Sequence, residues 1–505
     1  MRTEPMTHQL EGLRRLADNP EAFALSCEQG TGKTWMLLAD AERQWRDNRI
    51  DALLVIAPKG AHTNWTRREI PTHCDFPLLA DSWTASAGKK RTRKMERVLE
   101  RHRIPRDEQH TNPPAALVVF SMNIDAIASP KGWAFVKRFL AAHPRVMAVV
   151  DESQRIKNPK AARTKRAQLI SEHPSVVSRR IASGTLIPNS PVDVFAQFEF
   201  LRSGLLGTTS FRAFTARYAE LLPADSRLVM EAARRSRFRG ASPQIVRRDE
   251  DGRPMYRNLD DLSKRMAPYM YRVLKRDCLD LPPKVYRNHY FTMPPAQRRV
   301  YDAIADDRYW LDHDGDIHEL TALTVVAKLQ QAACGYLLGP DGHAQDMQHG
   351  EARLAALREV VEDIDGQFII WAVRREELRM IAELLEEQGI SAVSYHGGVS
   401  DGDRDAAVDA FQSGEARAFV ANPATAGRAL TLTAASVAVY FSCSFDFEER
   451  SQSEDRCHRI GTAGEAVLYI DIVAEDTVDE RIAAALQTKE GTAVRVLDPD
   501  RRAAA

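Results

Sequence analysis

Short and nearly unbroken runs of apolar residues recur along the chain, and each one ends in a polar loop before a helical pattern. The runs lie at residues 23–27, 53–57, 146–150, 368–371 and 418–421. Strands of a parallel sheet that is covered on both faces are apolar throughout, whereas half-exposed strands alternate apolar and polar positions. The pattern therefore predicts an α/β protein built on parallel sheets.

Between these runs, apolar residues recur at the spacing of helices. Leu10, Leu13 and Leu16 predict an amphipathic helix near the start, and further helices are expected at about 321–338 and 352–364. After residue 201 the strand pattern stops, and the chain becomes helical and rich in arginine.

Composition narrows the class of protein. The chain has 505 residues, enough for two to four domains, and 44% hydrophobic residues, which predicts globular cores. Lys+Arg and Asp+Glu both number 70, so any basic surface must be local. The six cysteines form no Cys-x-x-Cys pair, which argues against structural zinc. No stretch is long enough to span a membrane and no signal core is present, so we expect a cytoplasmic protein, bacterial or phage-encoded.

The heptapeptide Glu-Gln-Gly-Thr-Gly-Lys-Thr joins a predicted strand to a predicted helix, which is the context that a phosphate-binding loop needs. Gly30 and Gly32 let backbone N–H groups approach a polyphosphate. Lys33 would reach the β- and γ-phosphates, and the Thr34 hydroxyl would ligate magnesium. Cys27 stands where the strict P-loop pattern has glycine. The alternative is that the heptapeptide is a turn that matches by chance, and the flanking strand and helix and the other motifs argue against it.

An acidic pair follows the apolar run at 146–150. Asp151 would hold magnesium through its waters, and Glu152 would polarise the attacking water. Two acids at a strand end can also cap a helix, but together with the upstream loop they favour a catalytic interpretation. At another junction between strand and loop, Ser183 and Thr185 could connect the acidic pair to a bound nucleic-acid strand.

These blocks together resemble the Swi/Snf-like (sucrose-non-fermenting) family of superfamily 2 helicase-like, DNA-dependent ATPases. The heptapeptide is similar to motif I of that family, the block at 151–158 to motif II, and the block at 183–190 to motif III. The segment at 271–284, which ends in Leu-Pro-Pro-Lys, resembles the linker of members that track duplex DNA.

The resemblance implies two tandem RecA-like P-loop NTPase lobes with parallel sheets and helical insertions on both lobes. We expect a first, ATP-binding lobe, a helical insertion with the interlobe linker, a helical insertion of the second lobe, the second lobe with a C-terminal brace helix, and a tail. The expected bounds are 1–205, 206–284, 285–350, 351–490 and 491–505, respectively.

The resemblance also assigns residues to roles, partly through a Q motif, a motif Ia and a motif V. Nucleotide binding is expected of Gln9, Gly30, Thr31, Gly32, Lys33 and Thr34. Coupling between ATP and DNA is expected of Gln154, Ser183, Gly184, Thr185, Gly427 and Gln452. DNA contacts are expected of Lys59, Asn64, Trp65, Lys157 and Thr425.

Two arginines complete the expected catalytic set of Lys33, Asp151 and Glu152. Arg456 and Arg459 are three residues apart and so share one face of a predicted helix. They could therefore reach one point, the γ-phosphate held by the opposite lobe, as arginine fingers that contribute roughly 10³–10⁵ in rate. The alternative is an exposed basic helix.

We therefore expect an ATP hydrolase that uses ATP and Mg²⁺ and translocates along double-stranded DNA. It would grip the phosphate backbone with little sequence preference, and a protein partner could recruit it. Two alternatives remain. One is a true strand-separating DNA helicase, and the other is a nucleotide-gated DNA-binding subunit of a larger phage or defence complex.

Overall fold

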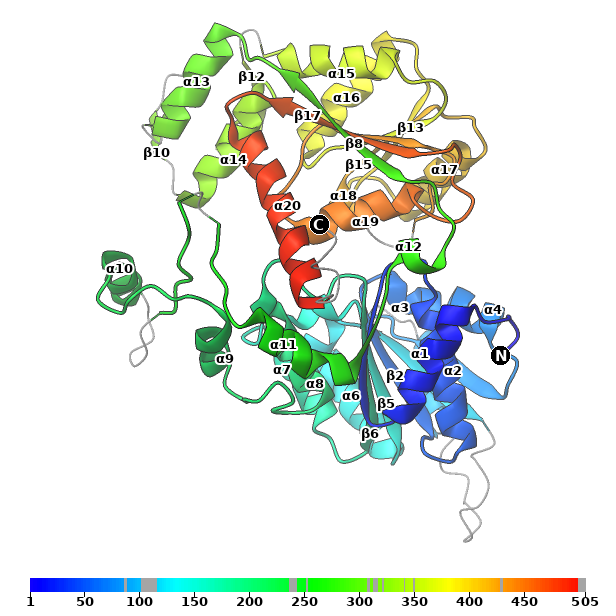
Figure 1. Ribbon diagram of the computed structural model, residues 1–505. Coiled ribbons are helices and arrows are strands. Elements are labelled where there is room, and N and C mark those ends of the chain that lie inside the picture. The colour runs from blue at the N-terminus through cyan, green and yellow to red at the C-terminus, as the bar shows by residue number, and fades with distance from the viewer. Residues whose placement is uncertain are drawn as a thin grey trace. The chain divides into compact units, whose positions relative to one another are not determined.

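The computed structural model describes residues 1–85, 89–100, 116–235, 243–250, 253–306, 309–311, 317–319, 322–339, 341–347, 350–426 and 430–497. The chain forms two compact units (Figure 1). The first consists of Met1–Leu279 together with Lys489–Ala505, and the second of Asp280–Thr488.

In the described residues, the first unit contains a seven-stranded sheet with the order β3-β4-β2-β5-β6-β1-β7, and every neighbouring pair is parallel. This confirms the parallel α/β fold predicted from the apolar runs. The strands are β1 (Ala22–Cys27), β2 (Ala52–Ala57), β3 (Leu78–Ser82), β4 (Leu117–Asn123), β5 (Val146–Asp151), β6 (Val176–Ser183) and β7 (Met270–Val273).

Helices cover both faces of this sheet. In β2, Leu54 and Ile56 pack into one apolar cluster with α6 (Pro130–Ala142) and α8 (Val194–Leu201). The alternate residues Leu53 and Val55 pack into a second cluster with the helix that follows β1. Successive strand residues point to opposite faces, so a sheet buried on both faces needs an apolar residue at every position.

The second unit repeats this arrangement with a six-stranded parallel sheet, in the order β14-β15-β13-β16-β17-β8. Within β13, Phe368 and Ile370 face one apolar cluster, whereas Ile369 and Trp371 face the other. The strands are β8 (Lys284–Phe291), β13 (Phe368–Trp371), β14 (Ala392–Tyr395), β15 (Ala418–Ala421), β16 (Val437–Tyr440) and β17 (Val467–Ala474). Two small antiparallel ribbons add β9 (Tyr309–Leu311) with β10 (Ile317–Glu319), and β11 (Tyr336–Leu338) with β12 (Ala344–Asp346).

The remaining helices connect these strands. In the first unit they are α1 (Thr7–Asp18), α2 (Lys33–Arg46), α3 (Ala61–Asn64), α4 (Ile70–His73), α5 (Lys89–Glu100), α7 (Ala162–Ser171), α9 (Phe211–Tyr218), α10 (Arg227–Arg235), α11 (Leu259–Met266) and α12 (Lys275–Cys278). From the second unit onward they are α13 (Pro295–Asp306), α14 (Ala322–Ala333), α15 (Ala352–Glu362), α16 (Arg375–Glu387), α17 (Asp401–Gln412), α18 (Pro423–Ala426), α19 (Phe447–Cys457) and α20 (Val478–Leu497). Throughout the described residues, no helix is both long enough and apolar enough to cross a membrane.

Three segments differ from the sequence-based expectation. The linker begins with β7, which pairs with β1 in the first sheet, so its first residues belong to that unit. The range 285–350, expected to be a helical insertion, opens with β8, which pairs with β17. β8 lies at the edge of its sheet and is largely exposed, so it has no apolar run. The helix expected at 321–338 ends at Ala333, and β11 follows a turn in which Gly335 has a φ of 88°.

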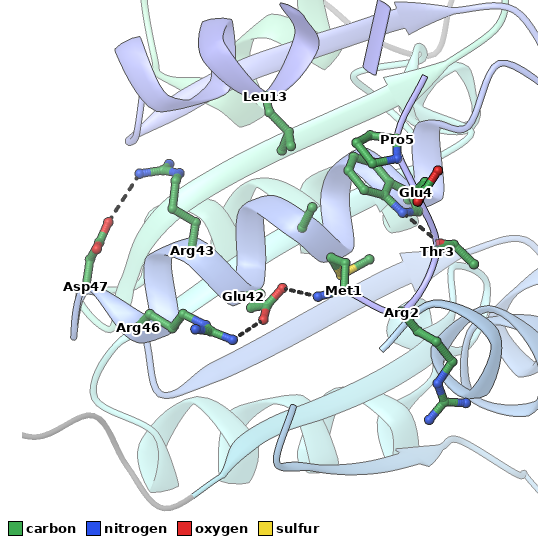
Figure 2. Close-up of a pocket in the computed structure, with 12 residues that line it drawn as sticks. Met1, Arg2, Thr3, Glu4, Pro5, Leu13, Glu42, Arg43, Arg46 and Asp47 are labelled. Atoms are coloured by element: carbon green, nitrogen blue, oxygen red, sulfur yellow. Dashed lines mark hydrogen bonds and ion pairs between the residues drawn. The ribbon is translucent and has the colours of Figure 1, made fainter. Parts of the chain in front are cut away.

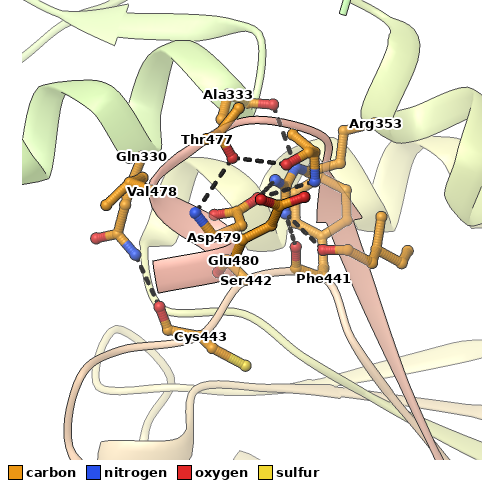
Figure 3. A network of polar contacts seen from close by, with 12 residues as sticks. Gln330, Ala333, Arg353, Phe441, Ser442, Cys443, Thr477, Val478, Asp479 and Glu480 are labelled. Atoms are coloured by element: carbon orange, nitrogen blue, oxygen red, sulfur yellow. Dashed lines mark hydrogen bonds and ion pairs between the residues drawn. The ribbon is translucent and has the colours of Figure 1, made fainter. Parts of the chain in front are cut away.

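A buried arginine holds the start of α20 in the second unit (Figure 3). Arg353, 1% exposed, forms an ion pair with Asp479 on α20. Its guanidinium also donates to the carbonyls of Ala333, at 3.2 Å, and Phe441, at 2.5 Å. Because four elements meet at this one side chain, its removal leaves several buried acceptors unpaired.

Arg353→Ala should destabilise the protein by about 3–5 kcal/mol, the usual effect of breaking a buried ion pair. Urea unfolding monitored by circular dichroism measures this change. Arg358→Ala provides the control on the same helix, because Arg358 is half exposed and lies 3.9 Å from an exposed Glu387. The control should change the free energy of unfolding by less than about 1 kcal/mol. Equal effects of the two variants would contradict the role of Arg353.

Candidate active site

The turn between β1 and α2 has the backbone of a phosphate-binding loop. Gly30 and Gly32 have φ values of 83° and 84°, which favour glycine, and α2 begins at Lys33 directly afterwards. The N–H groups in the first turn of α2, which contains Thr34, are the groups that bind anions at helix N-termini. Cys27, where the strict motif has glycine, is the last residue of β1 and is fully buried, so an extended strand residue replaces glycine without strain.

Lys33 lies inside this loop. Its Nζ donates to the carbonyls of Cys27, at 2.8 Å, and Glu28, at 3.2 Å, and the residue is only 8% exposed. The Thr31 hydroxyl donates to the same Glu28 carbonyl at 2.8 Å. A positive charge that donates to backbone carbonyls of this loop fits a polyphosphate.

Gln9 contacts the P-loop directly. Its Nε2 donates to the Thr31 carbonyl at 3.3 Å, and His8 Nε2 lies 2.8 Å from the same oxygen. A Cβ on Gly32 would lie 2.0 Å from Gln9 Nε2, and the φ of 84° at this position also favours glycine. Gln9 thus supports the loop in this structure, and contact with a nucleotide base stays a prediction.

The acidic pair stands at the end of β5. Asp151 Oδ2 accepts a hydrogen bond from Trp65 Nε1 at 3.0 Å, and Oδ1 accepts from the Glu152 N–H at 3.1 Å. Burial, followed by the neighbouring Glu152, raises the pKa of Asp151 to about 6. Within the described residues its hydrogen-bond donors are neutral, and such a carboxylate suits Mg²⁺, which prefers oxygen ligands.

A relay of hydrogen bonds connects Glu152 to Ser183 and Thr185 through the side chain of Gln154. Glu152 has a φ of 52° and accepts from Gln154 Nε2 at 2.7 Å. Gln154 Oε1 accepts from the Ser183 hydroxyl at 2.6 Å, and Ser183 Oγ accepts from the Thr185 N–H at 2.9 Å. A Cβ on Gly184 would lie 3.6 Å from the backbone nitrogen of Gln29, so this relay ends beside the P-loop.

The residues expected to contact DNA fall into two groups. Lys59 is exposed, and Asn64, Lys157 and Thr425 are half-buried, so each has some surface. Trp65 differs, because it is 2% exposed and its indole N–H is directed at Asp151. The buried ring leaves no face for a phosphate backbone, which corrects the expectation of a DNA contact at this residue.

In the second unit, α19 ends at Cys457, with His458 as its C-cap. Arg459 therefore lies beyond the helix, which corrects the expectation that the two arginines share a helix face. Both guanidinium groups bond to neighbouring residues of one segment, because Arg456 donates to the carbonyl of Leu430 at 3.3 Å and Arg459 donates to the Thr431 hydroxyl at 3.0 Å.

Three other residues expected to act in the second unit are Gln452, Thr425 and Gly427. Gln452 accepts from Arg456 Nε at its carbonyl, 2.9 Å away, and its own side chain donates to Glu448. The Thr425 N–H donates to Asn422 Oδ1 at 3.2 Å. Gly427 lies outside the described residues.

Sequence reasoning missed Lys275, which is 2% exposed. Its backbone N–H donates to the Glu28 carboxylate at 2.7 Å, and its Cε would lie 4.0 Å from a Cβ on Gly30. Its only sequence signal is a lysine within the linker motif. The contact with the P-loop arises because β7 pairs with β1.

A groove along α2 lies apart from these residues (Figure 2). It is lined by Met1, Leu13 and Glu42 among others, and the indole of Trp35 donates to the Thr3 hydroxyl at 3.0 Å on its wall. None of the residues expected to bind nucleotide or DNA is among those that line it.

The fold and the site together define a helicase-like P-loop NTPase. Residues 8–337 match the model of the SNF2-related domain, and residues 352–461 match the helicase conserved C-terminal domain. The chain therefore belongs to the SNF2-related family, as its motifs indicated.

Curated relatives agree with this family. An uncharacterized ATP-dependent helicase of Mycoplasma genitalium is 22% identical over 502 residues, which cover 98% of this chain and 42% of the relative. Protein CHROMATIN REMODELING 24 of Arabidopsis thaliana is 23% identical, over 94% of this chain and 45% of its own. Human TATA-binding protein-associated factor 172 is 24% identical, over 70% of this chain and 21% of its own length. The chain thus spans less than half the length of these relatives.

Among solved structures, the SWI2/SNF2 ATPase core of Sulfolobus solfataricus in complex with dsDNA is 18% identical. The match covers 98% of this chain and 94% of that one, with a TM-score of 0.39.

Asp151→Asn should stabilise the protein at neutral pH in EDTA. An aspartate in an unfolded chain has a pKa of about 3.9, whereas that of Asp151 is about 6. As the pH rises between these values, the unfolded chain loses its proton first, so the wild type loses stability. Above that window the variant should be more stable by about 2 kcal/mol, with little difference near pH 4.

Urea unfolding at both pH values tests this expectation. Asp18→Asn is the control, since Asp18 is exposed on α1 and should show no such dependence. A gain from Asp151→Asn that is the same at both pH values would show that the effect has another cause.

Proposed function

We propose that this chain is a DNA-dependent ATP hydrolase that translocates along double-stranded DNA with Mg²⁺ as its metal ion. The observation that carries the proposal is the relay from Glu152 through Gln154 to Ser183, beside the P-loop that holds Lys33. A protein that only binds ATP does not need an oriented acid there, whereas hydrolysis does.

In this proposal, Lys33 binds the phosphates directly, whereas the acidic residues act through the metal ion and the attacking water. The β- and γ-phosphates would compete with the carbonyls of Cys27 and Glu28 for the ammonium of Lys33. Thr34 and Asp151 would hold magnesium, which supplies positive charge to the phosphate oxygens when bound. Gln154 would keep the Glu152 carboxylate oriented toward the attacking water.

Arg456 and Arg459 would act on the γ-phosphate as arginine fingers. Their guanidinium groups donate to two neighbouring residues, Arg456 to the Leu430 carbonyl and Arg459 to the Thr431 hydroxyl. Exchange of these neutral acceptors for a phosphate would strengthen the hydrogen bonds, because ionised acceptors bind guanidinium more strongly. The fingers would thus respond to the presence of ATP.

Lys59, Asn64, Lys157 and Thr425 would contact the phosphate backbone, which implies little dependence on sequence. The relatives named as ATP-dependent helicase and chromatin remodelling protein support a role on DNA. The proposal includes the five segments expected from the sequence, with β7 and β8 assigned to the sheets that they extend, as well as a cytoplasmic location and recruitment by a protein partner. Strand separation and a pure nucleotide switch are the outcomes against which it is tested.

Glu152→Gln should abolish ATP hydrolysis and preserve ATP binding, because it removes the base and leaves Asp151 and Lys33 in place. Lys33→Ala should abolish hydrolysis and weaken ATP binding. The expected fall in kcat for Glu152→Gln is at least about 10²-fold, the usual contribution of a general base. Phosphate release and titration with an ATP analogue measure the two effects. Glu172→Gln, at an exposed site after α7, is the control. Near-normal turnover by the Glu152 variant would contradict the assigned role.

Translocation without strand separation predicts a specific pair of results. A third strand bound in the major groove should be displaced in an ATP-dependent manner, whereas a forked duplex should stay paired. Duplex DNA of any sequence should stimulate hydrolysis, and binding should weaken with salt at a log–log slope near −0.9 per phosphate contact. Efficient unwinding of the fork would favour the helicase, and ATP-dependent affinity without turnover would favour the nucleotide switch.

A further inference from the structure

The indole of Trp65 forms a hydrogen bond with Asp151, a residue proposed to bind magnesium. Trp65 follows α3 as the first residue of a π-helix, η1 (Trp65–Glu69), and its side chain packs into the apolar cluster beneath α2. The ring is 2% exposed, and its N–H donates to Asp151 Oδ2 at 3.0 Å. π-Helical turns are frequent at functional sites because the extra residue redirects side chains.

This hydrogen bond fixes the direction of the Asp151 carboxylate. Its two oxygens each accept one bond, Oδ2 from the indole and Oδ1 from the Glu152 N–H, so the plane of the group is held from both sides. Each oxygen has a second lone pair that remains available to a metal or its waters. Partners of this kind, one bond behind a metal ligand, orient the ligand and tune its affinity.

We propose that Trp65 is a positioning residue that holds the Asp151 carboxylate for magnesium, and that it makes no contact with DNA. The inference rests on the proposed function only in taking Asp151 as a magnesium ligand. The residues beside Trp65 keep surface for DNA, since Asn64 is half-buried and Lys59 is exposed. In this proposal, the segment after β2 would contact DNA through Lys59 and Asn64, and from Trp65 onward it would support the metal site.

The test is the affinity of adenylyl imidodiphosphate, measured by calorimetry in MgCl₂ and in EDTA. The ratio of the two affinities measures the coupling between metal and nucleotide, independently of turnover. Trp65→Phe keeps the apolar ring and removes the N–H, so the ratio should fall by about tenfold. The affinity in EDTA should not change.

Trp35→Phe is the matched control. Trp35 is also a buried tryptophan of the same cluster, 5% exposed, but its indole donates to the Thr3 hydroxyl rather than to a metal ligand. This variant should leave the ratio unchanged. If Trp65→Phe does not fold, site-specific replacement with 3-benzothienylalanine removes the N–H and keeps the ring shape.

Duplex binding without nucleotide completes the test. Trp65→Phe should bind duplex DNA as tightly as the wild type, whereas Lys59→Ala should bind it more weakly. An unchanged affinity ratio, or a loss of duplex affinity in Trp65→Phe, would overturn the proposal. A wild-type protein that binds magnesium with nucleotide but is not stimulated by DNA would overturn the proposed function and leave the role of Trp65 standing.

Discussion

Helices cover both faces of the first sheet, and this burial restricts ligand-binding residues to the ends of its strands. Inside that sheet no polar side chain can reach a ligand, so ligand-binding groups gather where strands end. The neighbouring strands β2, β5, β6 and β1 end at the same edge, because the sheet is parallel. The P-loop, the acidic pair and the Ser183 block therefore meet there, although up to 155 residues separate the first from the last.

The polar groups at this edge are satisfied mainly by neutral partners. Lys33 is held by carbonyls, Asp151 by an indole and a backbone N–H, and Glu152 by the amide of Gln154. These hydrogen bonds orient the side chains, and burial, followed by the neighbouring Glu152, raises the pKa of the Asp151 carboxyl group. In the proposed function, a polyphosphate would add negative charge beside Lys33 and a divalent cation would add positive charge beside Asp151.

Two arginines of the second unit, Arg353 and Arg456, are buried. Arg353 is buried and paired with Asp479, and it serves to anchor α20. Arg456 is equally buried, and its guanidinium donates to the carbonyls of Gln452 and Leu430.

The sequence by itself determined the local features of this protein. The apolar runs predicted β1, β2, β5, β13 and β15 because a strand buried on both faces must be apolar at every position. Glycine in the P-loop was readable for a similar reason, since a positive φ strongly favours one residue type. The family motifs then indicated the SNF2-related family, which the domain matches confirm.

Only the tertiary structure decided the features that depend on pairing across long separations. β8 has no apolar run because it is exposed at an edge, and its strand character follows from its register with β17. Lys275 reaches the P-loop through the pairing of β7 with β1. Trp65 faces Asp151 because neighbouring parallel strands bring together residues 86 positions apart. The pattern of apolar and polar residues records burial, but hydrogen-bond partners that are distant in the chain are set by which strands lie side by side.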